Sequence, residues 1–109
     1  MQRLYQLSEI KLTIQEHPLV LLLIKTSQCG VCESIQVKVT DLLESYANVR
    51  GIYVFMGDAP DTAAEYLALS APTLLLFFQG KEVYREARFV RMDELEQVLQ
   101  RYEGALEEM

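Results

Sequence analysis

Residues 19–32 read LVLLLIKTSQCGVC, and this stretch decides the fold class. The segment Leu19–Lys25 is apolar until its last residue, and it is too short for a helix of typical length. Such a run fits a strand that is buried on both faces, as in a sheet covered by helices on each side. Three polar residues then break the pattern, and two cysteines follow, Cys29 and Cys32.

The residues after the cysteine pair carry a helical pattern. Apolar side chains recur at a spacing that forms one stripe of a helix, with polar residues off the stripe. The stripe consists of Ile35, Val39, Leu42, Leu43 and Tyr46. We therefore predict a helix that begins near the cysteines and ends near Asn48. The cysteine pair then lies where a buried strand turns into a helix.

The rest of the chain alternates between helical and extended patterns. Ser8 can cap a first helix, and Pro18 follows the end of that helix. The predicted elements are an extended piece at 4–7, a helix at 8–17, strands at 19–25 and 49–55, a helical segment within 58–70, a strand at 73–78, a hairpin turn at 79–80 and a strand at 82–86. A last amphipathic helix has the apolar stripe Met92, Leu95, Val98, Leu99, Tyr102 and Leu106.

This order of elements predicts an α/β fold. Strands that alternate with helices pair in parallel, and the final hairpin adds antiparallel strands. A three-layer α/β/α sandwich with a central mixed β-sheet satisfies both conditions. The chain has 109 residues and shows no internal repeat, low-complexity tract or linker, so a single domain over residues 1–109 is expected.

Charge and hydropathy exclude several classes of function. The formal net charge is −6, and Lys and Arg form no cluster, which disfavours nucleic acid and an anionic membrane surface as partners. A membrane-spanning helix needs about 20 apolar residues, and a signal peptide needs about 7–15 behind a basic start. The longest apolar run, Leu19–Ile24, is shorter than either. The expected location is the cytoplasm.

The cysteine spacing points to thiol chemistry. In a reducing compartment a cysteine pair serves redox chemistry or metal binding more often than structure. The free N–H groups and the dipole at a helix start stabilise negative charge, so we expect a lowered pKa for Cys29. Two intervening residues bring the sulfurs within bonding reach. Cys29, nearer the tip, can attack a substrate disulfide, and Cys32 can then attack the mixed disulfide.

Two further interpretations concern zinc and Lys25. A zinc site needs four ligands, and the chain has one cysteine pair and one histidine, so no metal is expected. Lys25 closes the buried strand shortly before Cys29. It either supplies a cation that stabilises the thiolate or reaches solvent at the strand end, and the second interpretation is favoured.

A second motif, Ala71-Pro72-Thr73, directly precedes the apolar strand at 73–78. Proline at the start of a strand needs an explanation, because it has no N–H to donate to the sheet. A cis peptide bond close to the cysteine pair supplies one.

Three stretches together resemble the thioredoxin family over nearly the whole chain. They are the strand followed by TSQCGVC at 26–32, the APTLLLFF strand at 71–78, and the GKEV hairpin at 80–83 with the helix after it. The resemblance implies the thioredoxin fold, with Cys29 as nucleophile and Cys32 as resolving thiol in a redox-active disulfide. It implies that Pro72 is a cis-proline facing them and that the Ala71 backbone pairs with an extended substrate.

By the same resemblance, the residues beside the cysteines, Gln28, Gly30 and Val31, contact the substrate together with Ala71 and Pro72. The implied partners are protein or peptide disulfides and a thioredoxin-reductase-like or thiol electron donor. No metal or organic cofactor is implied.

The chain departs from the family pattern at four places. Gln28 stands where the family usually has tryptophan, and Val31 stands where it usually has proline between the cysteines. Leu23 occupies the place of a buried acid that is thought to move protons to the resolving thiol. A glycine expected after the hairpin is replaced by Arg88 or Phe89, and a bulky side chain there narrows the substrate groove.

The sequence therefore predicts a thiol–disulfide oxidoreductase that reduces or exchanges protein disulfides. The departures leave an alternative open, in which a redox-sensing or adaptor domain binds a partner without general turnover. A third possibility, a scaffold without redox activity, is weakened because both cysteines are present.

Overall fold

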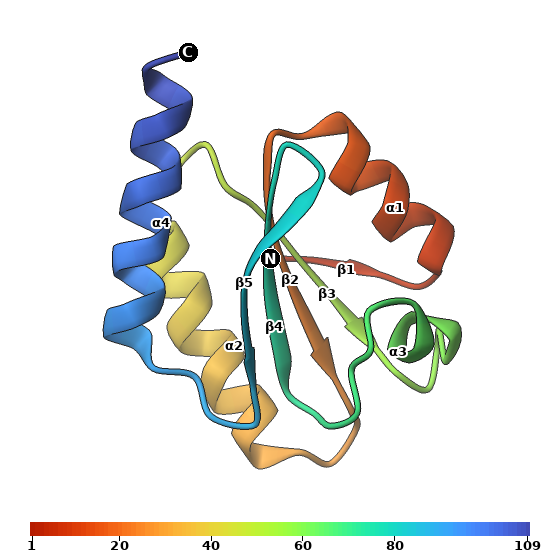
Figure 1. The fold of residues 1–109 in the computed structure, drawn as a ribbon. Helices are drawn as coiled ribbons and strands as arrows, with labels where there is room; N and C mark the ends of the chain where they lie inside the picture. Colours follow the sequence, from red (N-terminus) through yellow and green to blue (C-terminus); the bar gives the residue numbers. More distant parts are fainter.

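A computed structural model describes residues 1–109 as a five-stranded sheet with helices on both faces (Figure 1). In chain order the elements are β1 (Gln2–Leu4), α1 (Leu7–Glu16), β2 (Leu19–Lys25), α2 (Gly30–Leu43), β3 (Arg50–Phe55), α3 (Asp61–Glu65), β4 (Thr73–Phe78), β5 (Lys81–Ala87) and α4 (Met92–Glu107). The predicted α/β sandwich is confirmed. None of the helices is both long and apolar enough to cross a membrane.

The sheet has the strand order β1-β3-β2-β4-β5. β3 pairs in parallel with both β1 and β2, while β4 pairs antiparallel with β2 and with β5. The mixed sheet follows from the chain order, because helical crossovers join the parallel strands and a tight turn joins β4 to β5.

β2 is the centre of the sheet, and all seven of its residues are buried. Side chains along a strand point alternately to opposite faces. Val20, Leu22 and Ile24 join a cluster that includes Ile10 and Ile14 of α1. The alternate residues of β2, Leu19, Leu21 and Leu23, join the other cluster with residues of α2 and α4. Figure 1 accordingly shows α1 and α3 on one side of the sheet and α2 and α4 on the other.

Three predicted boundaries were wrong. The first extended piece is at 2–4 rather than 4–7, because Leu7 already begins α1. The residue that caps α1 is Gln6 rather than Ser8, and its backbone N–H donates a 3.0 Å hydrogen bond to the Glu9 carboxylate. α2 ends at Leu43 rather than near Asn48, although Tyr46 beyond its end is still buried.

The pairing of β2 with β4 brings two loops to one edge of the sheet. Ile24, one residue before the end of β2, is paired with Thr73, the first residue of β4. The residues that follow β2 and those that precede β4 therefore leave the sheet at the same edge. The segments with the cysteine pair and with Pro72 are neighbours for this reason.

The burial of β2 predicts a large stability loss on truncation. Leu22→Ala removes a fully buried side chain from the middle of the sheet, so we expect the free energy of unfolding to fall by about 2–5 kcal/mol. Leu12→Ala, on the exposed face of α1, is the matched control and should change it by less than about 0.5 kcal/mol. Urea unfolding measures both, and equal losses would contradict a core centred on β2.

Candidate redox site

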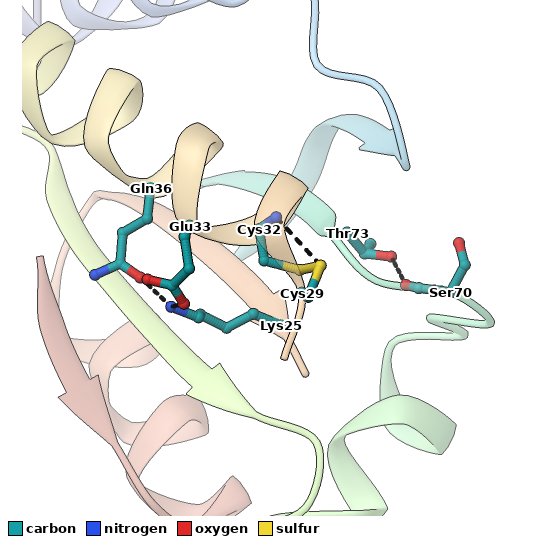
Figure 2. The surroundings of a disulfide bond; sticks show 7 residues. All are labelled: Lys25, Cys29, Cys32, Glu33, Gln36, Ser70 and Thr73. Carbon is teal, nitrogen blue, oxygen red and sulfur yellow. Dashed lines mark hydrogen bonds and ion pairs between the residues drawn. A yellow bond between two sulfur atoms is a disulfide. The ribbon is translucent and has the colours of Figure 1, made fainter. Parts of the chain in front are cut away.

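Cys29 and Cys32 are joined by a disulfide at the start of α2 (Figure 2). Cys29 is the N-cap of the helix, with an extended backbone, and Cys32 lies in the first turn, so their Cα atoms are 5.3 Å apart. The two sulfurs differ in environment. Cys32 is completely buried, whereas Cys29 is half-buried and lies nearer the surface. An outside reactant therefore meets the Cys29 sulfur first.

The helix start provides hydrogen bonds to Cys29. The backbone N–H of Cys32 donates to Sγ of Cys29 at 3.2 Å, and the N–H of Glu33 donates to the Cys29 carbonyl oxygen. The first N–H groups of a helix have no acceptor within the helix, and they carry its partial positive charge. One of these groups is thus directed at the Cys29 sulfur, where it favours negative charge.

The loop before β4 is held tightly at the same edge. The Ala71–Pro72 peptide bond is cis, and Pro72 is buried. The Thr73 hydroxyl donates to the Ser70 carbonyl at 2.6 Å, and the backbone N–H of Arg88 donates to the Pro72 carbonyl at 2.7 Å. Ala71 is only half-buried, and neither its N–H nor its carbonyl makes a backbone hydrogen bond. Both groups remain available to an outside partner.

The residues immediately around Cys29 are open to solvent. Gln28, Gly30 and Val31 are exposed, and Val31 as a residue is 52% exposed. A Cβ atom built onto Gly30 would meet no other atom within 4 Å. The structure therefore brings together on one edge the cysteine pair and all five residues that the sequence predicts to contact a substrate.

Lys25 does not reach solvent, so the favoured interpretation of this residue was wrong. Its side chain is 2% exposed and forms an ion pair with Glu33, and its ammonium donates to Oε1 of Gln36. The ammonium also lies 5.1 and 4.8 Å from the ring centroids of Tyr53 and Phe55. Burial of a charge is costly unless it is paired, and here a carboxylate, an amide and two aromatic rings surround it.

The Lys25 ammonium is directed away from the disulfide. Figure 2 shows its side chain running beneath the first turn of α2, with the nitrogen at Glu33 and Gln36 rather than at either sulfur. Lys25 thus ties the end of β2 to the helix that carries the cysteines. Sequence reasoning missed this pair, and the only signal was a single charge at the end of an apolar run.

A buried carboxylate fixes the loop between β5 and α4. Glu86 accepts hydrogen bonds from the backbone N–H of Arg91 at 2.7 Å and from its Nε at 2.8 Å. The hydrogen bond to Glu86 raises the pKa of the Arg91 guanidinium. Burial raises the pKa of Tyr84 to about 12, and the charge of Glu86 acts in the same direction. Arg91 therefore stays charged and Tyr84 stays neutral across the neutral pH range.

Arg88 and Phe89 lie on this loop and are exposed. Arg88 has a φ of 70°, in the left-handed region that favours glycine. It is therefore Arg88, of the two, that matches the place where the family has glycine. No group of three or more His, Cys, Asp or Glu side chains that could hold a metal ion occurs in the structure.

Comparison with known proteins agrees with the geometry. The sequence profile described as Thioredoxin matches residues 5–101. The thioredoxin-like protein YdfQ of Bacillus subtilis (strain 168) is 32% identical over 108 residues, covering 95% of this chain and 96% of the relative. The thioredoxin of Staphylococcus aureus (strain Mu50) is 31% identical over 75 residues, covering 68% of this chain and 72% of its own length.

Solved structures share the same fold. The thioredoxin of Plasmodium falciparum matches with a TM-score of 0.84 at 19% identity, covering 94% of this chain and 99% of that one. The X-ray structure of Fasciola hepatica thioredoxin has the same TM-score and the same coverage at 25% identity.

The unequal burial of the Lys25–Glu33 pair predicts unequal costs of removing its two partners. Glu33→Gln leaves a buried ammonium without its carboxylate, so we expect the free energy of unfolding to fall by about 1–3 kcal/mol. Lys25→Met keeps an unbranched chain in the same space, and the Glu33 side chain, 63% exposed, returns to water. We expect that change to cost less than about 1 kcal/mol.

Urea unfolding of the oxidised variants measures both effects. Glu44→Gln, an exposed residue at the end of the same helix that forms no ion pair, is the control and should be neutral. A larger loss for Lys25→Met than for Glu33→Gln would contradict the described arrangement.

Proposed function

Because the chain belongs to the thioredoxin family of thiol–disulfide oxidoreductases, we propose that Cys29 and Cys32 form the redox centre of an enzyme that reduces or exchanges protein disulfides. The observation that carries this proposal is the hydrogen bond from the Cys32 N–H to Sγ of Cys29 at the start of α2. It stabilises the thiolate, which is the attacking form of a thiol.

The reaction starts from the dithiol form. The Cys29 thiolate attacks one sulfur of a substrate disulfide, which forms a mixed disulfide and releases the first substrate thiolate. Cys32, after losing its proton, then attacks the Cys29 sulfur and releases the second substrate thiol. The substrate gains two electrons, and the protein is left as the disulfide seen in the structure. A dithiol or a reductase-type donor returns it to the dithiol form.

The burial of the two cysteines supports this division of roles. Cys29 is partly accessible to a protein substrate, whereas Cys32 has no accessible surface and is bonded to the sulfur of Cys29. The substrate chain lies along the free backbone groups of Ala71, which offer one donor and one acceptor for β-augmentation. Exposed Gln28, Gly30 and Val31 adjoin the cysteines in the chain, and buried Pro72 lies on the neighbouring loop at the same edge of the sheet.

Leu23 makes resolution the slower half of this reaction. It is fully buried among apolar residues, at the place where the family has an acid that assists the resolving thiol. Cys32 therefore gives its proton to water or to the departing thiolate. Slow resolution prolongs the mixed disulfide, and this feature also favours the second candidate, a redox-sensing or adaptor domain that stays attached to one partner.

Replacing each cysteine by serine should stop disulfide reduction at a different step. Cys29→Ser should abolish reduction of a peptide disulfide, down to the uncatalysed rate, because no nucleophile remains. In Cys32→Ser, Cys29 should still attack the peptide disulfide, but the mixed disulfide should accumulate because no resolving thiol remains. Mass spectrometry of the intact protein detects this adduct. Ser45→Ala, exposed and just beyond α2, should react like the unaltered chain.

Continued reduction by Cys29→Ser at the normal rate would overturn the proposal. An unaltered protein that oxidises its dithiol once, but is not reduced again by any thiol donor, would instead support the adaptor function.

A further inference from the structure

A hollow of about 340 Å³ adjoins the cysteine pair. Its two walls are the first turns of α2 and the loop between β5 and α4, which lie side by side at the lower left of Figure 1. Gly30 and Val31, the residues between the two cysteines, belong to the first wall. The hollow therefore begins at the two residues that separate the sulfurs.

The hollow has an apolar surface and two cations. Val31 is 52% exposed and Phe89 is 79% exposed, and because both line the same hollow from opposite walls they give it a shared apolar surface. Lys38 comes from α2 and Arg88 from the opposite loop, and both are exposed. Neither forms an ion pair, whereas the ion pairs in the structure engage Arg3, Lys11, Lys25, Arg85 and Arg91.

The loop holds Arg88 in place before any partner binds. Glu86 anchors the far end of the loop through Arg91, and the Arg88 N–H is bonded to the Pro72 carbonyl. The left-handed backbone of Arg88 is a strained conformation for a residue with a side chain. Its guanidinium makes no hydrogen bond or ion pair within the protein, so the hollow is lined by a positive charge that has no partner in the fold.

We propose that this hollow binds the segment beside the substrate disulfide and selects segments with an acidic side chain next to an apolar one. The inference rests on the proposed function and adds the substrate class. A carboxylate lies between Lys38 and Arg88, and the apolar side chain packs on Val31 and Phe89. With a net charge of −6, the chain as a whole repels acidic partners, so local complementarity at this site decides which partners dock.

Matched peptide disulfides test the charge preference. Three peptides carry a Leu beside the disulfide cysteine and differ only at the next position, which holds Glu, Gln or Lys. The rate of a single turnover is measured after the reduced protein is mixed with each peptide at low salt. The unaltered protein should react with the Glu peptide roughly threefold to tenfold faster than with the Gln peptide, and slowest with the Lys peptide. Added salt should shrink these ratios.

The variants Lys38→Gln and Arg88→Gln should each lower the Glu-to-Gln rate ratio, and the double variant should bring it close to one. Arg101→Gln removes an exposed, unpaired cation from α4 outside the hollow, and it should leave the ratio unchanged. No preference in the unaltered protein, or a preference retained by the double variant, would overturn the inference.

Binding without chemistry separates this inference from the proposed function. The Glu peptide with serine in place of cysteine should bind the oxidised protein more tightly than its Gln counterpart. On binding, the amide NMR signals of Val31, Lys38 and Arg88 should change their chemical shifts. Binding of this kind without any disulfide reduction would remove the proposed function and keep the acid-selective surface. Reduction of all three peptides at the same rate would keep the proposed function and remove the acid-selective surface.

Discussion

The burial of β2 on both faces is the constraint on which the structure depends. A strand with no solvent-facing side needs helices over each face, and the alternation of its side chains divides the core into two clusters. A strand in the centre of a sheet also ends abruptly where its neighbours end. The chain must turn into α2 at that edge, and the unpaired N–H groups of the new helix lie beside Cys29. The chemistry of the site is thus set by the packing of the strand.

The same burial explains the unusual charge arrangement near the cysteines. Leu23, at the family's acidic position, points into the cluster that underlies α2, and it adds only packing. A buried charge is found instead at Lys25, two residues later in the strand, and its partner Glu33 is on the surface of the helix. The charge pair holds strand and helix together at the junction without touching the sulfurs. The buried charge at this junction therefore anchors the helix, and the position of the family's acid is filled by an apolar side chain.

Apolar runs made much of the fold predictable from the sequence. The bounds of β2 and β4 matched because each run is bracketed by polar residues or proline, and the cysteine pair fell at a strand–helix junction as expected. The destination of Lys25 could not be predicted, because its partners Glu33 and Gln36 lie on another element and periodicity does not report contacts between elements. The end of α2 was predicted too late for a related reason. Tyr46 continues the apolar spacing and is buried, although the helix has already ended at Leu43.

The loop after β5 shows how a departure from a family pattern acquires meaning only in three dimensions. In sequence, Arg88 in place of glycine reads as a bulky side chain that narrows a groove. In the structure, its backbone keeps the left-handed conformation that glycine adopts freely, at a cost of about 1–3 kcal/mol. Glu86 and Pro72 hold the loop from both sides, so the strain is stably maintained. The Arg88 guanidinium makes no hydrogen bond or ion pair within the fold that offsets that cost, and Arg88 instead lines the hollow beside Gly30 and Val31.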